Sequence, residues 1–340
     1  RLPRRSSPDG LCAVPRGGWG PGFLCGGYLL QHDRVTRDTA EFLRATFQSL
    51  EPVPVYVAPG NHDWYGPESI YARNDWSPNV HVFRGPRLVP VPLRAGLTLW
   101  GGAHLAPANT DDFLAGFRVD GPGAHIALFH AAERSWFAEQ GAGKQPHAAF
   151  DAEAIEAAGL SHAFLGHYHR PKDAERHTYP GNPDPLDFGE DGLRGVVIAR
   201  VAEDGSLIRE RRVVAQTEVH DLVLDVGGCG SSQEIRDRLR GLAGERSGIA
   251  RLTVGGELEP EVDLREDDLR HVLLGTFDAV RVRLGDLRSG YDLAAIREEQ
   301  TVRGAFVSDV LDSDLPEDEK RRVLIAGLRA LDGRDDLDVL

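Results

Sequence analysis

Short apolar runs that end in polar side chains recur through the first half of the chain. Residues 53–58 are rich in valine and bounded by prolines, and they lead into Gly-Asn-His-Asp at residues 60–63. A second run ends at His130, and a third ends in Gly-His-Tyr-His at residues 166–169. Runs of this length and composition predict buried strands. Because ligands gather outside the carboxyl ends of strands in α/β sheets, we expect a site there.

The segments between these runs alternate between helical and extended patterns. Apolar residues at helical spacing predict a helix at about residues 36–50, and helices are also expected at about 133–140 and 151–159. Further strands are predicted at residues 80–84, 88–93, 97–102, 176–179, 194–202 and 207–214. Strands interleaved with helices in this way predict an α/β fold, a β-sandwich flanked by helices, over residues 23–216.

The pattern changes near Thr217. A strand at residues 219–226 precedes a capping box at residues 231–234, which opens a helix. Two more strands around a helix at about 265–274 complete a small α+β capping domain, which we place at residues 217–292. A helical tail follows at residues 293–340, and its last helix either docks on its own domain or binds a partner. Its apolar face is formed by Val323, Leu324, Leu328 and Leu331.

Composition narrows the class of protein. The 340 residues suggest about two domains, and no apolar run of about 18 residues is present, so we expect no membrane span. Cys12, Cys25 and Cys229 form neither a disulfide framework nor a Cys-x-x-Cys metal site, which favours a cytoplasmic location. The net charge of −14 argues against a free-standing nucleic-acid binder. It does not exclude a nuclease, because divalent cations offset carboxylates and a partner can supply a basic groove.

The polar strand ends offer candidate chemistry. Asn, His and Asp also form ordinary turns, and a single histidine is more often structural than a ligand. In an extended segment alternate side chains share a face, so His167 and His169 can point into one site. An imidazole, an amide oxygen and a carboxylate together suit a divalent metal and a phosphate. Three strand ends of the same kind therefore predict a metal site.

These stretches resemble the calcineurin-like metallophosphoesterases. The resemblance is carried by residues 60–63, His130 and residues 166–169. A narrower resemblance, to DNA repair exonucleases of the SbcD type, is carried by Tyr-Pro-Gly-Asn-Pro at residues 179–183 and Asp-Phe-Gly-Glu at residues 187–190. Those nucleases have Tyr-x-Gly-Ser-Pro followed by Phe-Gly-Glu, so an asparagine stands here where serine is usual. The likeness extends over about residues 23–340.

The resemblance implies a role for each candidate residue. One of two metal ions would be held by Asn61, His130 and His167, and the other by His169. His62 would stabilise developing charge or protonate the leaving oxygen, and Asp63 would orient His62. This ligand set suits Mn²⁺, with Mg²⁺ as a possible substitute. The resemblance also implies DNA ends as substrate, an SbcC-like coiled-coil ATPase subunit as partner, a possible homodimer and no membrane.

The first metal motif of the family is missing or degraded. The family begins with a strand that carries Asp-x-His, and residues 1–22 contain no such triplet, so we expect them to be irregular, disordered or out of frame. The family's second strand ends in Gly-Asp, but here Tyr28 follows Gly27. A phenol with an ordinary pKa of about 10 is a poor bridging ligand. His32 and Asp33 lie just beyond, either in a loop or within reach of the site.

We therefore expect at most one weakly bound metal and little nuclease activity. Two alternatives stay open. The first is another metallophosphoesterase that acts on nucleotides or phosphoproteins. The second is an inactive paralogue that serves as a binding subunit.

Overall fold

The chain divides into two compact units in a computed structural model. They are Arg1–Gln216 and Thr217–Leu340, and each is described separately below. The structure describes residues 11–13, 22–108, 110–140 and 146–334.

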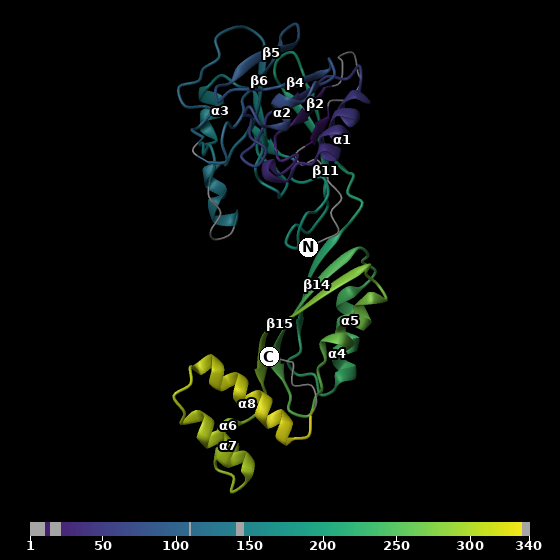
Figure 1. The fold of residues 1–340 in the computed structure, drawn as a ribbon, viewed down its shortest axis with the longest axis vertical. Helices are drawn as coiled ribbons and strands as arrows, with labels where there is room; N and C mark the ends of the chain where they lie inside the picture. Colours follow the sequence, from purple (N-terminus) through teal and green to yellow (C-terminus); the bar gives the residue numbers. More distant parts are fainter. Residues whose placement is uncertain (1–10, 14–21, 109, 141–145, 335–340) are drawn as a thin grey trace. The chain divides into compact units, whose positions relative to one another are not determined.

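Two six-stranded sheets form the first unit (Figure 1). The first sheet has the order β12-β11-β1-β2-β3-β4 and the second β5-β6-β7-β8-β10-β9. The strands of the first sheet are β1 Leu11–Ala13, β2 Phe23–Cys25, β3 Val55–Val57, β4 Val80–Val82, β11 Gly195–Val201 and β12 Leu207–Val213. Those of the second are β5 Val89–Arg94, β6 Leu97–Gly101, β7 Ala124–His130, β8 His162–Gly166, β9 Lys172–Asp173 and β10 His177–Tyr179.

Apolar side chains of both sheets pack into one central layer. Leu24 of β2 and Val197 of β11 meet Leu99, Ile126 and Phe164 of the second sheet there. Every residue of β7 is buried, because alternate side chains face this layer and the helices outside it. This double burial explains why the strand is a continuous apolar run in the sequence.

Helices cover the two outer faces. Buried side chains of α1 (Arg37–Gln48) and α2 (Ile70–Arg73) pack against β2, β3 and β4. On the other side, η2 (Arg134–Gln140) and α3 (Glu153–Ala157) pack against β7, β8 and β10. The first unit is therefore the predicted sandwich of two sheets flanked by helices, which confirms the fold class. A short 3₁₀ turn, η1 (His32–Arg34), precedes α1.

One segment differs from expectation. The prediction that residues 1–22 contain no packed element is wrong for Leu11–Ala13, which pairs with both β2 and β11. Three residues are too few to show a hydrophobic period, so only their neighbours in the sheet define this strand. Residues 1–10 and 14–21 lie outside the described part of the chain, and so does the expectation made for them.

The second unit has a parallel sheet in the order β13-β14-β15. Its strands are β13 Val219–Asp225, β14 Ile249–Leu258 and β15 Ala279–Ser289, and its crossover helices are α4 Ser232–Ala243 and α5 Glu266–Leu274. Both helices lie on one face of the sheet and share its core (Figure 1). Because each helix joins two parallel strands, this is an α/β arrangement and not the expected α+β one.

Three helices form the tail: α6 Leu293–Arg297, α7 Val302–Leu311 and α8 Glu317–Leu331. Leu324 and Leu328 of α8 are buried against α6 and α7, while Val323 is 40% and Leu331 45% exposed. The buried Arg329 donates a hydrogen bond to the carbonyl of Val262 at 2.8 Å, which ties α8 to its own unit. None of the described helices has the length and apolar character needed to cross a bilayer.

Candidate functional site

Strand ends from both sheets of the first unit meet at one edge. β2 and β3 are parallel neighbours in the first sheet, and β6, β7 and β8 are parallel neighbours in the second. The segments that leave these strands carry Tyr28, residues 60–63, His104, His130 and residues 166–169. The fold thus brings the three predicted strand ends together and adds two segments.

Glycines allow these strand ends to approach closely. A Cβ atom on Gly60 would lie 2.5 Å from Nδ1 of His130. A Cβ atom on Gly166 would overlap the carbonyl of Gly26, which is the acceptor for that same ring nitrogen. Side chains at either glycine would therefore push the imidazole of His130 out of place.

His130 faces Asn61 with an unprotonated nitrogen. Its Nδ1 donates a hydrogen bond to the carbonyl of Gly26 at 2.7 Å, and its Nε2 lies 2.9 Å from Oδ1 of Asn61. Burial, and then the neighbouring His167, lower the pKa of His130 well below its usual value. The ring is therefore neutral, and Nε2 presents a lone pair to the amide oxygen. A cation beside both atoms, or rotation of the amide, would relieve this contact.

The spacing of these donors fits one divalent cation. Two donors that bind an ion at about 2.1 Å and at a right angle lie about 3 Å apart. The 2.9 Å between His130 and Asn61 matches that spacing. The rings of His130 and His167 have centroids 5.2 Å apart, and two rings bound to one ion at angles from a right angle to a tetrahedral one have centroids about 4.5–5 Å apart. Asn61, His130 and His167 therefore fit the single ion that the sequence predicts for them.

The second predicted ion does not fit. Across the described ranges, no group of three or more His, Cys, Asp or Glu side chains can hold a metal, and this bears on both predicted ions, since the first has only His130 and His167 of these residue types beside Asn61. His169 has its Nδ1 bound to Glu190, and its ring lies 4.7 Å from that of Tyr28. A pair of dications without anionic donors is costly, so this position offers too few ligands.

Tyr28 stands among the site histidines, where the resemblance implies a carboxylate. Its ring centroid is 4.2 Å from that of His62 and 6.3 Å from that of His130. Its backbone has φ 67°, a left-handed conformation that is unusual for a bulky residue. The alternative role for His32 is not realised, because its ring stacks on Trp64 with centroids 3.9 Å apart. The side chain of Asp33 lies outside the described residues.

A pocket of about 310 Å³ opens at this edge. It is lined by Tyr28, Asn61, His62, Ala132, Phe137, Pro146, His147, His167, Tyr168 and His169. Burial lowers the pKa of His167 to about 3 and also lowers that of His147. These two imidazoles are thus neutral lone-pair donors at neutral pH, and such a wall suits a cation better than a bare anion.

The role expected for Asp63 is wrong. Its Oδ1 accepts hydrogen bonds from the amides of Tyr28 and Gly60, both at 2.9 Å. Its Oδ2 accepts from the amide of Leu29 at 3.1 Å and from the hydroxyl of Tyr71 at 2.6 Å. A carboxylate has about four acceptor positions, so none is left to orient His62. Asp63 holds two loops together instead.

Gln31 takes the place expected of Asp63 beside His62. Its Oε1 lies 3.0 Å from Nδ1 of His62, so an amide and not a carboxylate faces this imidazole. No local pattern marks this pair, because the two residues lie 31 positions apart in the chain.

Two further histidines, which no motif in the sequence marks, lie at this site. His104 is fully buried, and its Nε2 donates to the carbonyl of His130 at 2.7 Å, which supports the backbone of that strand end. Burial lowers its pKa to about 4, and its Nδ1 is buried with no hydrogen-bond partner. His147 lines the pocket, and its ring centroid is 5.6 Å from that of His167. Neither His104 nor His147 belongs to one of the three strand-end motifs recognised in the sequence.

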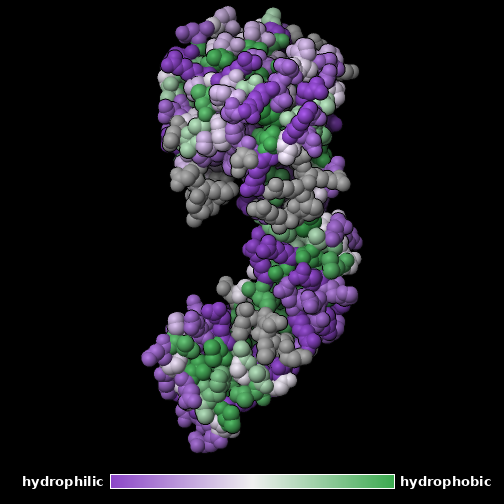
Figure 2. All heavy atoms as spheres, viewed as in Figure 1, coloured by the Kyte–Doolittle hydropathy of each residue, from purple (hydrophilic) through white to green (hydrophobic). Residues whose placement is uncertain are grey.

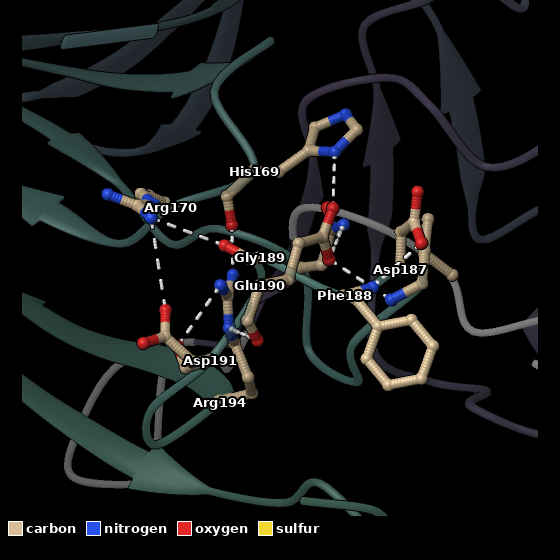
Figure 3. Close-up of polar contacts among 10 residues, drawn as sticks. His169, Arg170, Asp187, Phe188, Gly189, Glu190, Asp191 and Arg194 are labelled. Carbon is tan, nitrogen blue, oxygen red and sulfur yellow. Dashed lines mark hydrogen bonds and ion pairs between the residues drawn. The ribbon is translucent and has the colours of Figure 1, made fainter. Parts of the chain in front are cut away.

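Glu190 contacts His169, one of the residues that line the pocket. The Nδ1 and Oε1 atoms are 2.6 Å apart (Figure 3). Burial alone would raise the pKa of Glu190, but the hydrogen bond and electrostatic attraction to His169, together with the hydrogen bonds from Leu186 and Asn182, outweigh it and hold the pKa below its usual value. The carboxylate is therefore ionised at neutral pH.

One family model matches residues of the first unit. Residues 22–171 match the family model described as calcineurin-like phosphoesterase. The match ends before residues 179–190, so it does not bear on the narrower resemblance to SbcD-type nucleases. No curated protein matches the sequence. The sandwich of two sheets and the strand-end site both lie largely within the matched residues, and members of this family typically bind divalent metals. The match over residues 22–171 therefore supports a place for this unit in the calcineurin-like phosphoesterase superfamily, and a domain of that kind implies metal-dependent hydrolysis of phosphoesters.

Proposed function

We propose that this chain is a DNA exonuclease subunit of an SbcCD-like repair complex, with an impaired metal site. The observation that carries the proposal is the position of the two motif stretches that distinguish such nucleases. Asn182 of the first stretch donates to Glu190 of the second at 2.7 Å, and Glu190 contacts His169 of the pocket. The narrower motif and the phosphoesterase motif thus contribute to one site.

In this proposal Asn61, His130 and His167 hold one divalent cation, Mn²⁺ or Mg²⁺. Such an ion, when bound, supplies positive charge to a phosphoryl oxygen. His62 lines the same pocket and is oriented by Gln31, so it is placed to donate a proton to the leaving oxygen. Tyr28 takes the place of an anionic ligand, which is why we expect a weak site and slow cleavage.

The proposed partners follow from the same resemblance. DNA ends would enter the pocket, and an SbcC-like coiled-coil ATPase subunit would contact the tail. Hydrophobic residues are visible on one face of this tail (Figure 2). Val323 and Leu331 of α8 stay exposed while Leu324 and Leu328 serve the chain's own core. We also propose that the chain can form a homodimer.

The test compares substrates and variants. The full chain is incubated with Mn²⁺ and either linear duplex DNA or a cyclic nucleotide, and product is measured over time. We expect slow release of nucleotides from DNA ends and none from a closed circle. Asn61→Ala and His62→Gln should each lower this rate at least about tenfold, because each removes a group at the pocket. His220→Gln, in the second unit, is the matched control.

Two outcomes would contradict the proposal. Hydrolysis of the cyclic nucleotide but not of DNA would favour the alternative of a small-molecule phosphoesterase. No hydrolysis of any substrate, with no Mn²⁺ bound in calorimetry, would favour an inactive binding subunit. The alternative of an inactive binding subunit is supported by the three proposed metal ligands, Asn61, His130 and His167, because none of them is a carboxylate.

A further inference from the structure

A buried carboxylate contacts the imidazole of His169, one of the residues that line the pocket. Glu190 is 8% exposed, and its Oε1 lies 2.6 Å from Nδ1 of the imidazole. Figure 3 shows this ring nitrogen directed at the carboxylate and the other ring nitrogen pointing away from it. A carboxylate only accepts hydrogen bonds, so Nδ1 must carry the proton.

Other contacts fix Glu190 itself. Its second oxygen, Oε2, accepts hydrogen bonds from the side-chain amide of Asn182 at 2.7 Å and from the backbone amide of Leu186 at 3.0 Å. The buried Arg194 donates to the carbonyl of Glu190 at 3.1 Å and also to the carbonyl of His169. Both ends of the contact are thereby held by one guanidinium (Figure 3). The carboxylate therefore has little freedom to turn away from the ring.

We infer that Glu190 is a positioning residue, which locks His169 in the Nδ1–H tautomer with Nε2 as a lone-pair donor in the pocket. This inference rests on the proposed function, because it assigns His169 a part in the site. A neutral imidazole free in water favours the opposite tautomer, with the proton on Nε2. The contact with Glu190 must therefore reverse an ordinary preference, and that reversal can be measured without metal or DNA.

The hydrogen bond from His169 to Glu190 fixes the direction of the Nε2 lone pair before any ligand binds. Groups that are oriented by a hydrogen-bonded carboxylate lose little freedom on binding, and their partners typically contribute 10–100-fold to affinity or activity. It also gives a physical role to Asn182 and Glu190, which the sequence marked only as parts of a motif.

The test reads the tautomer by NMR. The full chain is labelled with ¹⁵N-histidine, and long-range ¹H–¹⁵N spectra are recorded at about pH 8, with the His169 signals assigned from a His169→Gln variant. We expect His169 to be mainly Nδ1–H in the wild type. In Glu190→Gln the ratio of Nδ1–H to Nε2–H should fall about tenfold, because a charge-assisted hydrogen bond is replaced by a neutral one. Glu190→Asp, which keeps the charge, should retain part of the preference.

The control is Glu133→Gln. Glu133 is also buried, at 3% exposed, and its carboxylate accepts hydrogen bonds from Ser135, so the His169 tautomer should not change when this carboxylate is replaced. A wild-type His169 that is mainly Nε2–H would overturn the inference, and so would an unchanged ratio in a folded Glu190→Gln. The tautomer of His169 in the wild type is itself a test, so the inference can still be refuted if a variant misfolds. A wild type that cleaves no DNA, yet shows the Nδ1–H tautomer, would refute only the proposed function.

Discussion

Replacing Asp63 by asparagine should lower the free energy of unfolding of the first unit. The side chain is fully buried and accepts four hydrogen bonds, three from backbone amides and one from the hydroxyl of Tyr71. Burial, and then Asp63, raise the pKa of Tyr71 well above its usual value, so this hydroxyl stays a donor. Asparagine replaces one acceptor oxygen by an NH₂ group, which then faces donors that it cannot satisfy.

The expected loss follows from the number of bonds affected. Two of the four hydrogen bonds lose their acceptor, and a hydrogen bond to a charged group contributes about 1.5–3 kcal/mol. The free energy of unfolding should therefore fall by about 3 kcal/mol or more, a large part of the roughly 5–15 kcal/mol that domains have. Tyr71→Phe removes one donor and leaves the carboxylate, so its effect should be smaller.

Urea unfolding followed by tryptophan fluorescence measures this loss. All five tryptophans lie in residues 1–216, so the signal reports the first unit alone. With a slope of at most about 3 kcal/mol per molar urea, the midpoint should fall by about 1 M or more. Asp75→Asn, at an exposed position nearby, is the matched control and should stay within about 0.5 kcal/mol.

One result would refute the reasoning. If Asp63→Asn left the midpoint unchanged but abolished hydrolysis, the carboxylate would act on the chemistry and not on the loops. That result would restore the role that the sequence suggested, in which Asp63 orients His62.

Three further predictions concern the pocket and its surroundings. Gly60→Ala should displace the ring of His130 and destabilise the first unit by about 2 kcal/mol or more, measured as the same midpoint. Unfolding should become easier as the pH falls from about 6.5 towards about 4, because burial lowers the pKa of His104 to about 4 and that of His162 to about 3. The unfolded chain binds more protons than the folded one in that window, so each of these imidazoles should lower the free energy of unfolding by about 2 kcal/mol near pH 5. A urea midpoint that does not change between about pH 7 and 5 would contradict this. Tyr28→Asp should raise the affinity for Mn²⁺ at least about tenfold in calorimetry by adding an anionic donor, whereas equal affinities of Tyr28→Asp and Tyr28→Phe would argue against it.

The sequence predicted the strand ends well because their signals are local. Residues 53–58 and the run before His130 are continuous apolar stretches, as strands buried on both faces must be. The order of the elements then placed the motifs at neighbouring carboxyl ends, and Asn61, His130 and His167 lie together as expected. That they bind a metal stays a prediction.

Side-chain partners could not be predicted in the same way. The sequence placed Asp63 beside His62 because the two are adjacent, but adjacent side chains point to different surroundings. Which group reaches His62 depends on how the Gly27 turn packs on the Gly60 turn, and this brings Gln31 into contact. His147 was missed for a similar reason, because only the fold places it beside the pocket.

The grip of Asp63 on the turn at residue 28 has a genetic consequence. Its carboxylate binds the amides of residues 28 and 29, so the loop keeps its course whatever side chain residue 28 carries. Aspartate also adopts a left-handed backbone more readily than tyrosine does. Tyrosine and aspartate codons differ at a single base, so a point mutation could return an acidic group to this loop without any rebuilding. The backbone of this turn therefore already accommodates the aspartate that the resemblance implies at residue 28.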